Sequence, residues 1–171
     1  MGRKHRFRHP RCLLKERSTA PAKPENGDEI FCNGIFRFHI SALLDWLKEH
    51  PQPVVEMPIC LWESSGSKED CYVEAADVTR PIVIAEIAPD YRDFLCEIPE
   101  SSWDIRGYVC IDGYHRIEKA RRMGLETLPA VILRMEQHVP FLYSGYEQYT
   151  DYWNGKLEER SQDAQRIPAE K

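Results

Sequence analysis

One stretch of this chain, residues 107–133, constrains its fold more than any other; it reads GYVCIDGYHRIEKARRMGLETLPAVIL. The apolar run at residues 108–111 is typical of a strand. Asp112-Gly113 follows, and a tight turn is expected there because glycine adopts backbone angles that other residues avoid. Residues 114–123 have a helical period, and residues 129–133 return to an apolar strand pattern. The stretch therefore predicts a strand, a turn, a helix and a second strand.

The predicted helix has one apolar side. Ile117, Ala120 and Met123 recur every three residues and are expected to face the core. Gly124 follows at the place where a left-handed C-cap is common. The last turn before it carries two arginines, which suit the negative end of the helix dipole. The C-terminal end of the helix is therefore marked clearly.

The turn before the helix concentrates residues with binding chemistry. The first N–H groups of a helix lack partners within it, and the helix dipole is positive there, so an anion is favoured. Arg116 can fork onto phosphate oxygens, and His115 can donate to a phosphate or act as a general acid or base. Asp112 can hold magnesium through water or accept a proton from a hydroxyl. The alternative is a plain capped turn, in which Asp112 caps the helix, Arg116 pairs with an acid and His115 is solvated.

The apolar run at residues 81–87 predicts a buried strand with polar residues near both ends. Arg80 begins it and is a second candidate phosphate ligand; the alternative is a surface arginine in a salt bridge. Glu86 shares a face with Ile82 and Ile84 by alternation. It is therefore expected to be a buried partner for an arginine or a general base with a raised pKa. The alternative is that the strand has reached solvent at Glu86.

Patterns elsewhere predict the remaining elements. They are a hairpin around Asn33-Gly34, a helix over 42–50 capped by Ser41, an edge strand within 54–62 interrupted by Pro58, a loop or lid over 89–106, a connector over 137–141 and a helix over 146–160. On the last helix Tyr149, Tyr152 and Trp153 have the spacing of a core face, with base stacking as the alternative. His138 is expected to cap the connector or to line the site.

Composition narrows the class of protein. A hydrophobic content of 42% indicates a packed core, and no run of about 18 apolar residues exists that would predict a membrane span. The six cysteines form no CxxC pair, so no zinc or redox motif is expected. Cysteines without such motifs favour a reducing, cytoplasmic setting.

Charge is distributed unevenly along the chain. The net charge is −5, and residues 1–23 contribute +7 to it, so the remaining residues contribute −12. The acidic part is not typical of a nucleic-acid binder, whereas the basic segment can attract a phosphate backbone or an acidic partner. The alternative is a disordered, solubilising arm. The expected organisation is a basic tail over 1–28, one domain over 29–160 and a frayed tail over 161–171.

The ordered pieces together resemble the signature of the ParB/sulfiredoxin superfamily. In that superfamily an apolar strand leads into a glycine-containing motif ending in His-Arg or Arg-Arg, then a helix, then Gly-Leu-x-Thr-x-Pro and a strand. The matching pieces here are residues 109–111, 112–116, 117–123, 124–129 and 130–133. Arg80-Pro81 also resembles the Arg/Gln-Pro strand start of the same superfamily. The match covers about residues 78–133, roughly a third of the chain.

The resemblance implies a small α+β fold, with a small mixed sheet and packed helices, whose His-Arg turn binds nucleotide phosphates. The Asp-Gly-x-His-Arg form looks closest to the free serine kinases, where the acid and the histidine sit beside the transferred phosphoryl group. By this resemblance the phosphate ligands are Arg80, Gly113, Tyr114, His115 and Arg116. The catalytic candidates are Asp112, His115 and, from the strand pattern, Glu86.

Two departures from the superfamily pattern limit the expected chemistry. Sulfiredoxins carry a catalytic cysteine at the place of Tyr114, so reduction of sulfinic acid is not expected. ParB partition proteins have a Gly-Glu-Arg-Arg form and bind CTP, and no evident helix-turn-helix follows the motif here. The expectation is a phosphotransferase or NTPase that uses ATP, ADP or CTP with Mg²⁺ on a small molecule. The alternative is a non-catalytic nucleotide- or DNA-binding module whose residues 3–23 contact nucleic acid.

Overall fold

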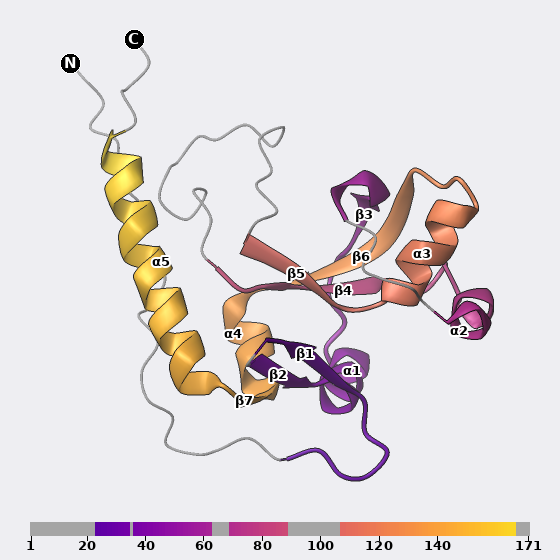
Figure 1. Cartoon of the computed structure of the whole chain (residues 1–171), viewed down its shortest axis with the longest axis horizontal. Helices are drawn as coiled ribbons and strands as arrows, with labels where there is room; N and C mark the ends of the chain where they lie inside the picture. Colours follow the sequence, from indigo (N-terminus) through magenta and orange to yellow (C-terminus); the bar gives the residue numbers. More distant parts are fainter. Residues whose placement is uncertain (1–22, 35, 63–68, 89–106, 167–171) are drawn as a thin grey trace.

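The computed structural model describes residues 23–34, 36–62, 69–88 and 107–166, with side chains described up to residue 159. The predictions for the basic segment before residue 23 and for the loop over 89–106 lie outside these residues. The described part of the chain forms two small sheets and five α-helices (Figure 1). The predicted α+β class is therefore confirmed.

The larger sheet has four strands in the order β3-β6-β4-β5, and only its β4–β6 pair is parallel. The smaller sheet has three antiparallel strands in the order β1-β2-β7. The strand bounds are β1 Ile30–Asn33, β2 Phe36–His39, β3 Val54–Pro58, β4 Ile82–Glu86, β5 Tyr108–Asp112, β6 Thr127–Leu133 and β7 Leu142–Ser144. The predicted hairpin and the predicted edge strand are both present, as β1–β2 and β3.

The helices lie around these sheets, with α2 and α3 at one end and α5 at the other (Figure 1). Their bounds are α1 Ile40–Glu49, α2 Asp70–Ala75, α3 Tyr114–Arg122, α4 Met135–His138 and α5 Tyr146–Arg166, with short 3-10 turns η1 Ile59–Leu61 and η5 Val139–Phe141. No helix in the described ranges is long and apolar enough to cross a bilayer.

Strand β4 lies inside the core on both faces, because all five of its residues are buried. Val83 and Ala85 belong to one apolar cluster, which also contains Trp153 of α5. Ile82 and Ile84 belong to a second cluster, which lies under α3. The predicted alternation of this strand is therefore confirmed, and β4 joins the two halves of the core.

The central stretch folds as β5, a turn, α3 and β6. Ile117 and Ala120 are buried as predicted, and Gly113 and Gly124 have φ of 117° and 71°. Met123 is 55% exposed, so its predicted place in the core is wrong. Helix α3 ends at Arg122, and the side chain of the C-cap residue Met123 has already turned into solvent.

Ser41 does not cap α1, contrary to prediction. The helix begins two residues earlier than predicted, at Ile40 with His39 as its N-cap, and no side chain caps it. The Ser41 Oγ instead accepts a hydrogen bond from the Glu29 N–H at 2.7 Å, and the Glu29 carbonyl accepts from the Ile40 N–H at 2.9 Å. The start of α1 therefore holds the residue that precedes β1.

The aromatic residues of α5 pack mainly in the core. Tyr149 and Trp153 are fully buried and Leu157 is 2% exposed, whereas Tyr152 is 37% exposed. The prediction from helical spacing is thus confirmed for Tyr149 and Trp153, which lie in the core, and is wrong for Tyr152, which is exposed.

Candidate functional site

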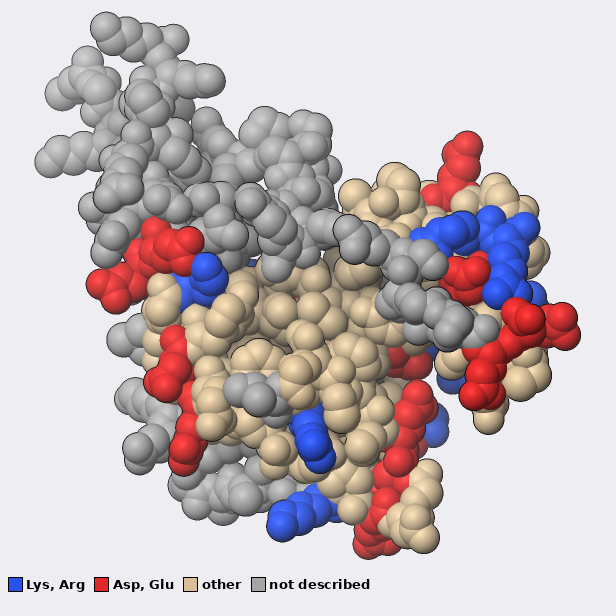
Figure 2. All heavy atoms as spheres, in the orientation of Figure 1, with Lys and Arg blue, Asp and Glu red and all other residues tan. Residues whose placement is uncertain are grey.

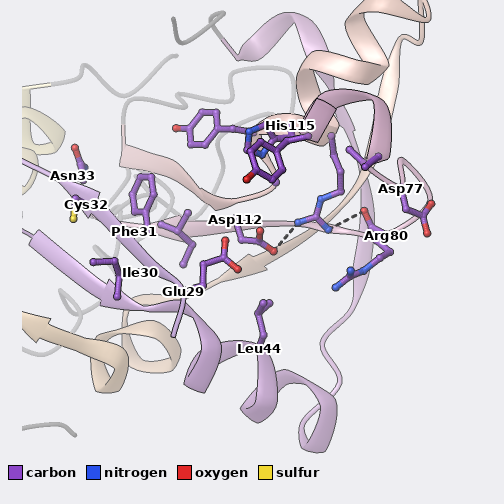
Figure 3. A pocket seen from close by; sticks show the side chains of 17 residues that line it. Glu29, Ile30, Phe31, Cys32, Asn33, Leu44, Asp77, Arg80, Asp112 and His115 are labelled. Atoms are coloured by element: carbon purple, nitrogen blue, oxygen red, sulfur yellow. Dashed lines mark hydrogen bonds and ion pairs between the residues drawn. The ribbon is translucent and has the colours of Figure 1, made fainter. Parts of the chain in front are cut away.

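A cleft of about 740 Å³ opens between the two sheets, beside the turn from β5 into α3 (Figure 3). Its walls come from β1 and the residues before it, from α1, from the end of α2 and from the loop that leads to β4. Six of the seven residues that the sequence predicts for the site line this cleft: Arg80, Asp112, Gly113, Tyr114, His115 and Arg116. The seventh, Glu86, does not line it.

Gly113 gives the turn its shape. Its φ of 117° is unfavourable for residues with a side chain. An added Cβ would also lie 2.5 Å from the Ile82 Cγ2 atom. Gly113 is the N-cap of α3 and provides no side-chain cap, so the first turn of the helix faces the cleft with its amide end. The helix dipole makes this end favourable for an anion.

Arg116 has a structural role: it connects the turn before α3 to the start of β4. It is only 8% exposed, and its guanidinium donates to the Asp112 carboxylate at 2.6 Å and to the Pro81 carbonyl at 2.8 Å. This is the pairing that the capped-turn alternative predicted for Arg116. Asp112, however, makes no cap hydrogen bond to the helix, so that part of the alternative is wrong. These contacts of Arg116 fix the turn against the start of β4.

Arg80 and His115 are the exposed, nitrogen-bearing side chains of the cleft. The Arg80 guanidinium makes no hydrogen bond or ion pair to a described residue, so the salt-bridge alternative is not observed there. The His115 ring lies against Tyr72, with ring centroids 5.6 Å apart. Both side chains therefore have nitrogen atoms that a ligand in the cleft can reach.

The cleft contains a second carboxylate that sequence reasoning missed. Glu29 lies just before β1, and its carboxylate faces that of Asp112 across the cleft (Figure 3). Only the folding of β1 beside β5 brings these residues together, so no local pattern signals the pair. Two carboxylates facing one space can each accept a proton or contribute one metal ligand.

The other lining residues that sequence reasoning missed include aromatic and acidic side chains. Phe31 of β1 stacks on Tyr114, with centroids 6.2 Å apart and planes at 19°. Burial raises the pKa of the Tyr114 phenol. Asp77 accepts hydrogen bonds from the Thr79 hydroxyl and the Thr79 N–H, which lower the pKa of the Asp77 carboxyl. Within the described residues, no group of three or more His, Cys, Asp or Glu side chains can hold a metal ion.

Glu86 is fully buried at the far end of β4 from Arg80. In the β4–β5 pairing it lies opposite Tyr108, whereas Asp112 lies opposite Val83. Its carboxylate accepts from the Met135 N–H at 3.1 Å and lies 3.4 Å from the Arg134 Nε. The prediction that Glu86 is buried and pairs with an arginine is therefore confirmed. The alternative, that the strand has reached solvent at Glu86, is wrong. The structure does not bring Glu86 together with the cleft residues.

His138 is also buried beside β4, so its predicted roles as a connector cap or a site residue are not observed. Its Nε2 lies 2.5 Å from the Glu86 carbonyl, and no side-chain cap is formed at this position. Burial lowers the pKa of His138 from 6.5 to about 4. The folded protein therefore holds this imidazole neutral where the unfolded chain would protonate it.

This difference predicts a loss of stability in mild acid. The contribution of neutral His138 is complete above pH 6.5 and is lost as the pH falls from 6.5 through about 4. The full loss is roughly 3 kcal/mol in the free energy of unfolding. Urea unfolding at several pH values should show a flatter slope in this window for His138→Gln, which keeps an amide donor for the Glu86 carbonyl. His50→Gln, at an exposed histidine, should keep the wild-type slope; an unchanged slope in His138→Gln would contradict the assignment.

The arginines of α3 are paired with acids, and Lys119 donates to backbone carbonyls. Arg121 and Arg122 both bind Glu118, and Arg122 also binds Asp70 of α2. Figure 2 shows these blue and red side chains interleaved at the α2–α3 end of the molecule. This face therefore lacks the unpaired basic stripe that binding to a phosphate backbone favours, as far as the described residues extend.

Comparison of the chain with protein-family models, curated proteins and solved structures finds no match.

Proposed function

We propose that the cleft binds the phosphates of a nucleotide with Mg²⁺, and that the protein is a phosphotransferase or NTPase acting on a small molecule. One observation carries this proposal. The glycine turn at the start of α3 and the Arg80 guanidinium, which makes no hydrogen bond or ion pair to a described residue, line the same cleft as two facing carboxylates. Phosphoryl transfer needs such positioning and charge neutralisation more than covalent chemistry.

The residues would divide the work as follows. The amide end of α3 and Arg80 hold phosphate oxygens, and His115 adds a donor at the cleft mouth. Arg116 acts indirectly, because its contacts keep the turn and Asp112 in place. Glu29 and Asp112 offer two carboxylates to a magnesium ion whose other ligands would be phosphates and water. The resemblance to the free serine kinases supports Asp112 and His115 as the groups beside the transferred phosphoryl.

A non-catalytic nucleotide-binding module is the second candidate. It is favoured by the Asp112–Arg116 ion pair, which already occupies one carboxylate oxygen at 2.6 Å. The two candidates differ in turnover: an NTPase or phosphotransferase releases or transfers phosphate in the presence of Mg²⁺, and a binding module does not. Phosphate release measured with each nucleotide, alone and with small hydroxyl compounds, separates them.

Nucleotide binding itself is tested by thermal unfolding with ATP, ADP, CTP or GTP and Mg²⁺. A ligand at 100 times its Kd stabilises the native state by about 2.7 kcal/mol, which raises the Tm by roughly 5–10 °C for a chain of this size. Arg80→Gln removes a charge-assisted bond to phosphate, so its Kd is expected to rise about tenfold or more. The Tm without ligand should stay unchanged, because Arg80 is exposed.

Arg37→Gln is the matched control, since Arg37 is an exposed arginine on β2 that does not line the cleft. It should bind like the wild type. If no nucleotide shifts the Tm of the folded protein, the proposed function is wrong. If nucleotide binds equally well to both variants, Arg80 is not a phosphate ligand.

A further inference from the structure

The cleft extends to both sides of the phosphate turn, and an aromatic pair lines each side. On the β1 side Phe31 and Tyr114 stack on each other, and both are partly buried. On the α2 side Tyr72 lies beside His115 and is 59% exposed. An aromatic ring left so open in a cleft has a free face for a planar group, whereas the Phe31–Tyr114 faces already cover each other.

The α2 side also lies away from the facing carboxylates. Glu29 is on the β1 side of the cleft, where its carboxylate faces that of Asp112 (Figure 3). A base placed there would displace the groups that can take part in phosphoryl transfer. A base on the α2 side leaves them free, so the α2 wall is the better base subsite.

Among the described residues, this wall offers few side-chain groups that could read a base by hydrogen bonds, namely the His115 ring and the second carboxylate oxygen of Asp77. Ala75 and Ala76 line it with methyl groups. The Lys119 ammonium donates to the Glu74 carbonyl at 2.7 Å and to the Ala76 carbonyl at 2.8 Å, so each of these backbone acceptors already takes one hydrogen bond. At Asp77, one carboxylate oxygen holds the Thr79 hydroxyl at 2.6 Å and the Thr79 N–H at 2.9 Å.

We infer that the base of a bound nucleotide is held mainly by stacking on Tyr72, so that the cleft accepts nucleoside triphosphates with little regard to their base. The inference rests on the proposed nucleotide site and adds the class of ligand that it takes. Every base has a π-face, so stacking on an aromatic side chain tolerates all four. The cleft would instead select its ligands by their phosphates, which Arg80 and the turn at Gly113 would bind.

The test compares dissociation constants of ATP, GTP, CTP, UTP and inorganic tripolyphosphate, each with Mg²⁺, measured by titration calorimetry on the full chain. The four nucleotides are expected to agree within about threefold and to bind about tenfold tighter than tripolyphosphate. Tyr72→Ala should remove this tenfold advantage for all four and leave tripolyphosphate unchanged. Tyr72→Phe should restore it, because stacking needs the ring and not the hydroxyl.

Tyr152→Ala is the matched control, because Tyr152 is an exposed tyrosine on α5 outside the cleft. One nucleotide bound more than about tenfold tighter than the rest would overturn base indifference. Weak binding of UTP alone would do the same, since uracil lacks an exocyclic amine that could donate a hydrogen bond to the second Asp77 oxygen. Nucleotide dissociation constants that are unchanged in Tyr72→Ala would overturn the stacking subsite but would leave the proposed function standing. Absence of binding by nucleotides and tripolyphosphate together would overturn both.

Discussion

Replacing Arg116 with methionine is expected to destabilise the fold by about 3–5 kcal/mol, because it leaves a largely buried carboxylate without its partner. The Asp112 side chain is 13% exposed, and the Arg116 Nη2 lies 2.6 Å from it. The variant also removes the donor to the Pro81 carbonyl. Chemical unfolding should report the loss directly, and nucleotide binding should weaken with it because the turn loses its tie to β4.

A second substitution separates the contribution of the ion pair to stability from the contribution of side-chain packing. Asp112→Asn in the Arg116→Met background removes the unpaired charge, so the double variant should recover at least about 1 kcal/mol relative to the sum of the single effects. Arg122→Met is the control on the same helix, because Arg122 is 45% exposed and its removal should change the stability little. A loss for Arg116→Met no larger than for Arg122→Met would mean that the pair contributes no net stability.

Replacing Gly113 with alanine is expected to cost about 2–5 kcal/mol of stability, from backbone strain at a φ of 117° and from overpacking. The new Cβ would lie 2.5 Å from the Ile82 Cγ2 and 3.1 Å from the Arg116 Nε. Ile82 is fully buried in the core strand β4, so it cannot move aside easily. Because the turn must shift, phosphate binding should be lost even in molecules that stay folded.

Gly155→Ala is the matched control for this substitution. Gly155 lies within α5, and a Cβ there meets nothing within 4 Å. The variant should be as stable as the wild type or more stable by up to about 1 kcal/mol, since alanine favours a helix more than glycine does. A Gly113→Ala protein with wild-type stability and nucleotide affinity would contradict the assigned geometry of the turn.

Much of the fold could be predicted because its central elements have strong local patterns. Strand β4 is an unbroken apolar run, and α3 lies between two glycines that both adopt positive φ. The sequence did not predict α2 or β7. Helix α2 has only six residues, and its register against α3 depends on long-range contacts such as Lys119 with the Glu74 carbonyl. Strand β7 has three residues and is defined by pairing with β2.

The candidate site was predictable where its residues are contiguous in sequence or, as for Arg80, stand at the start of a predicted strand. Residues 112–116 form one turn, so their shared location follows from local structure. Glu29 and Tyr72 reach the cleft through the packing of β1 and α2, which leaves no local signature. For Glu86, alternation along β4 correctly indicated a buried acid but could not say which end of the strand faces the cleft.

The two walls of the cleft belong to different sheets, yet both sheets contribute to one apolar cluster. Phe38 and Leu142 of the smaller sheet pack in the same cluster as Val83 and Ile111 of the larger one. The walls therefore cannot separate without opening close-packed core. The cleft is preorganised: a ligand that bridges the walls meets a gap of set width and loses little free energy to ordering the protein. Selection among ligands should accordingly follow their length between the walls as well as their charge.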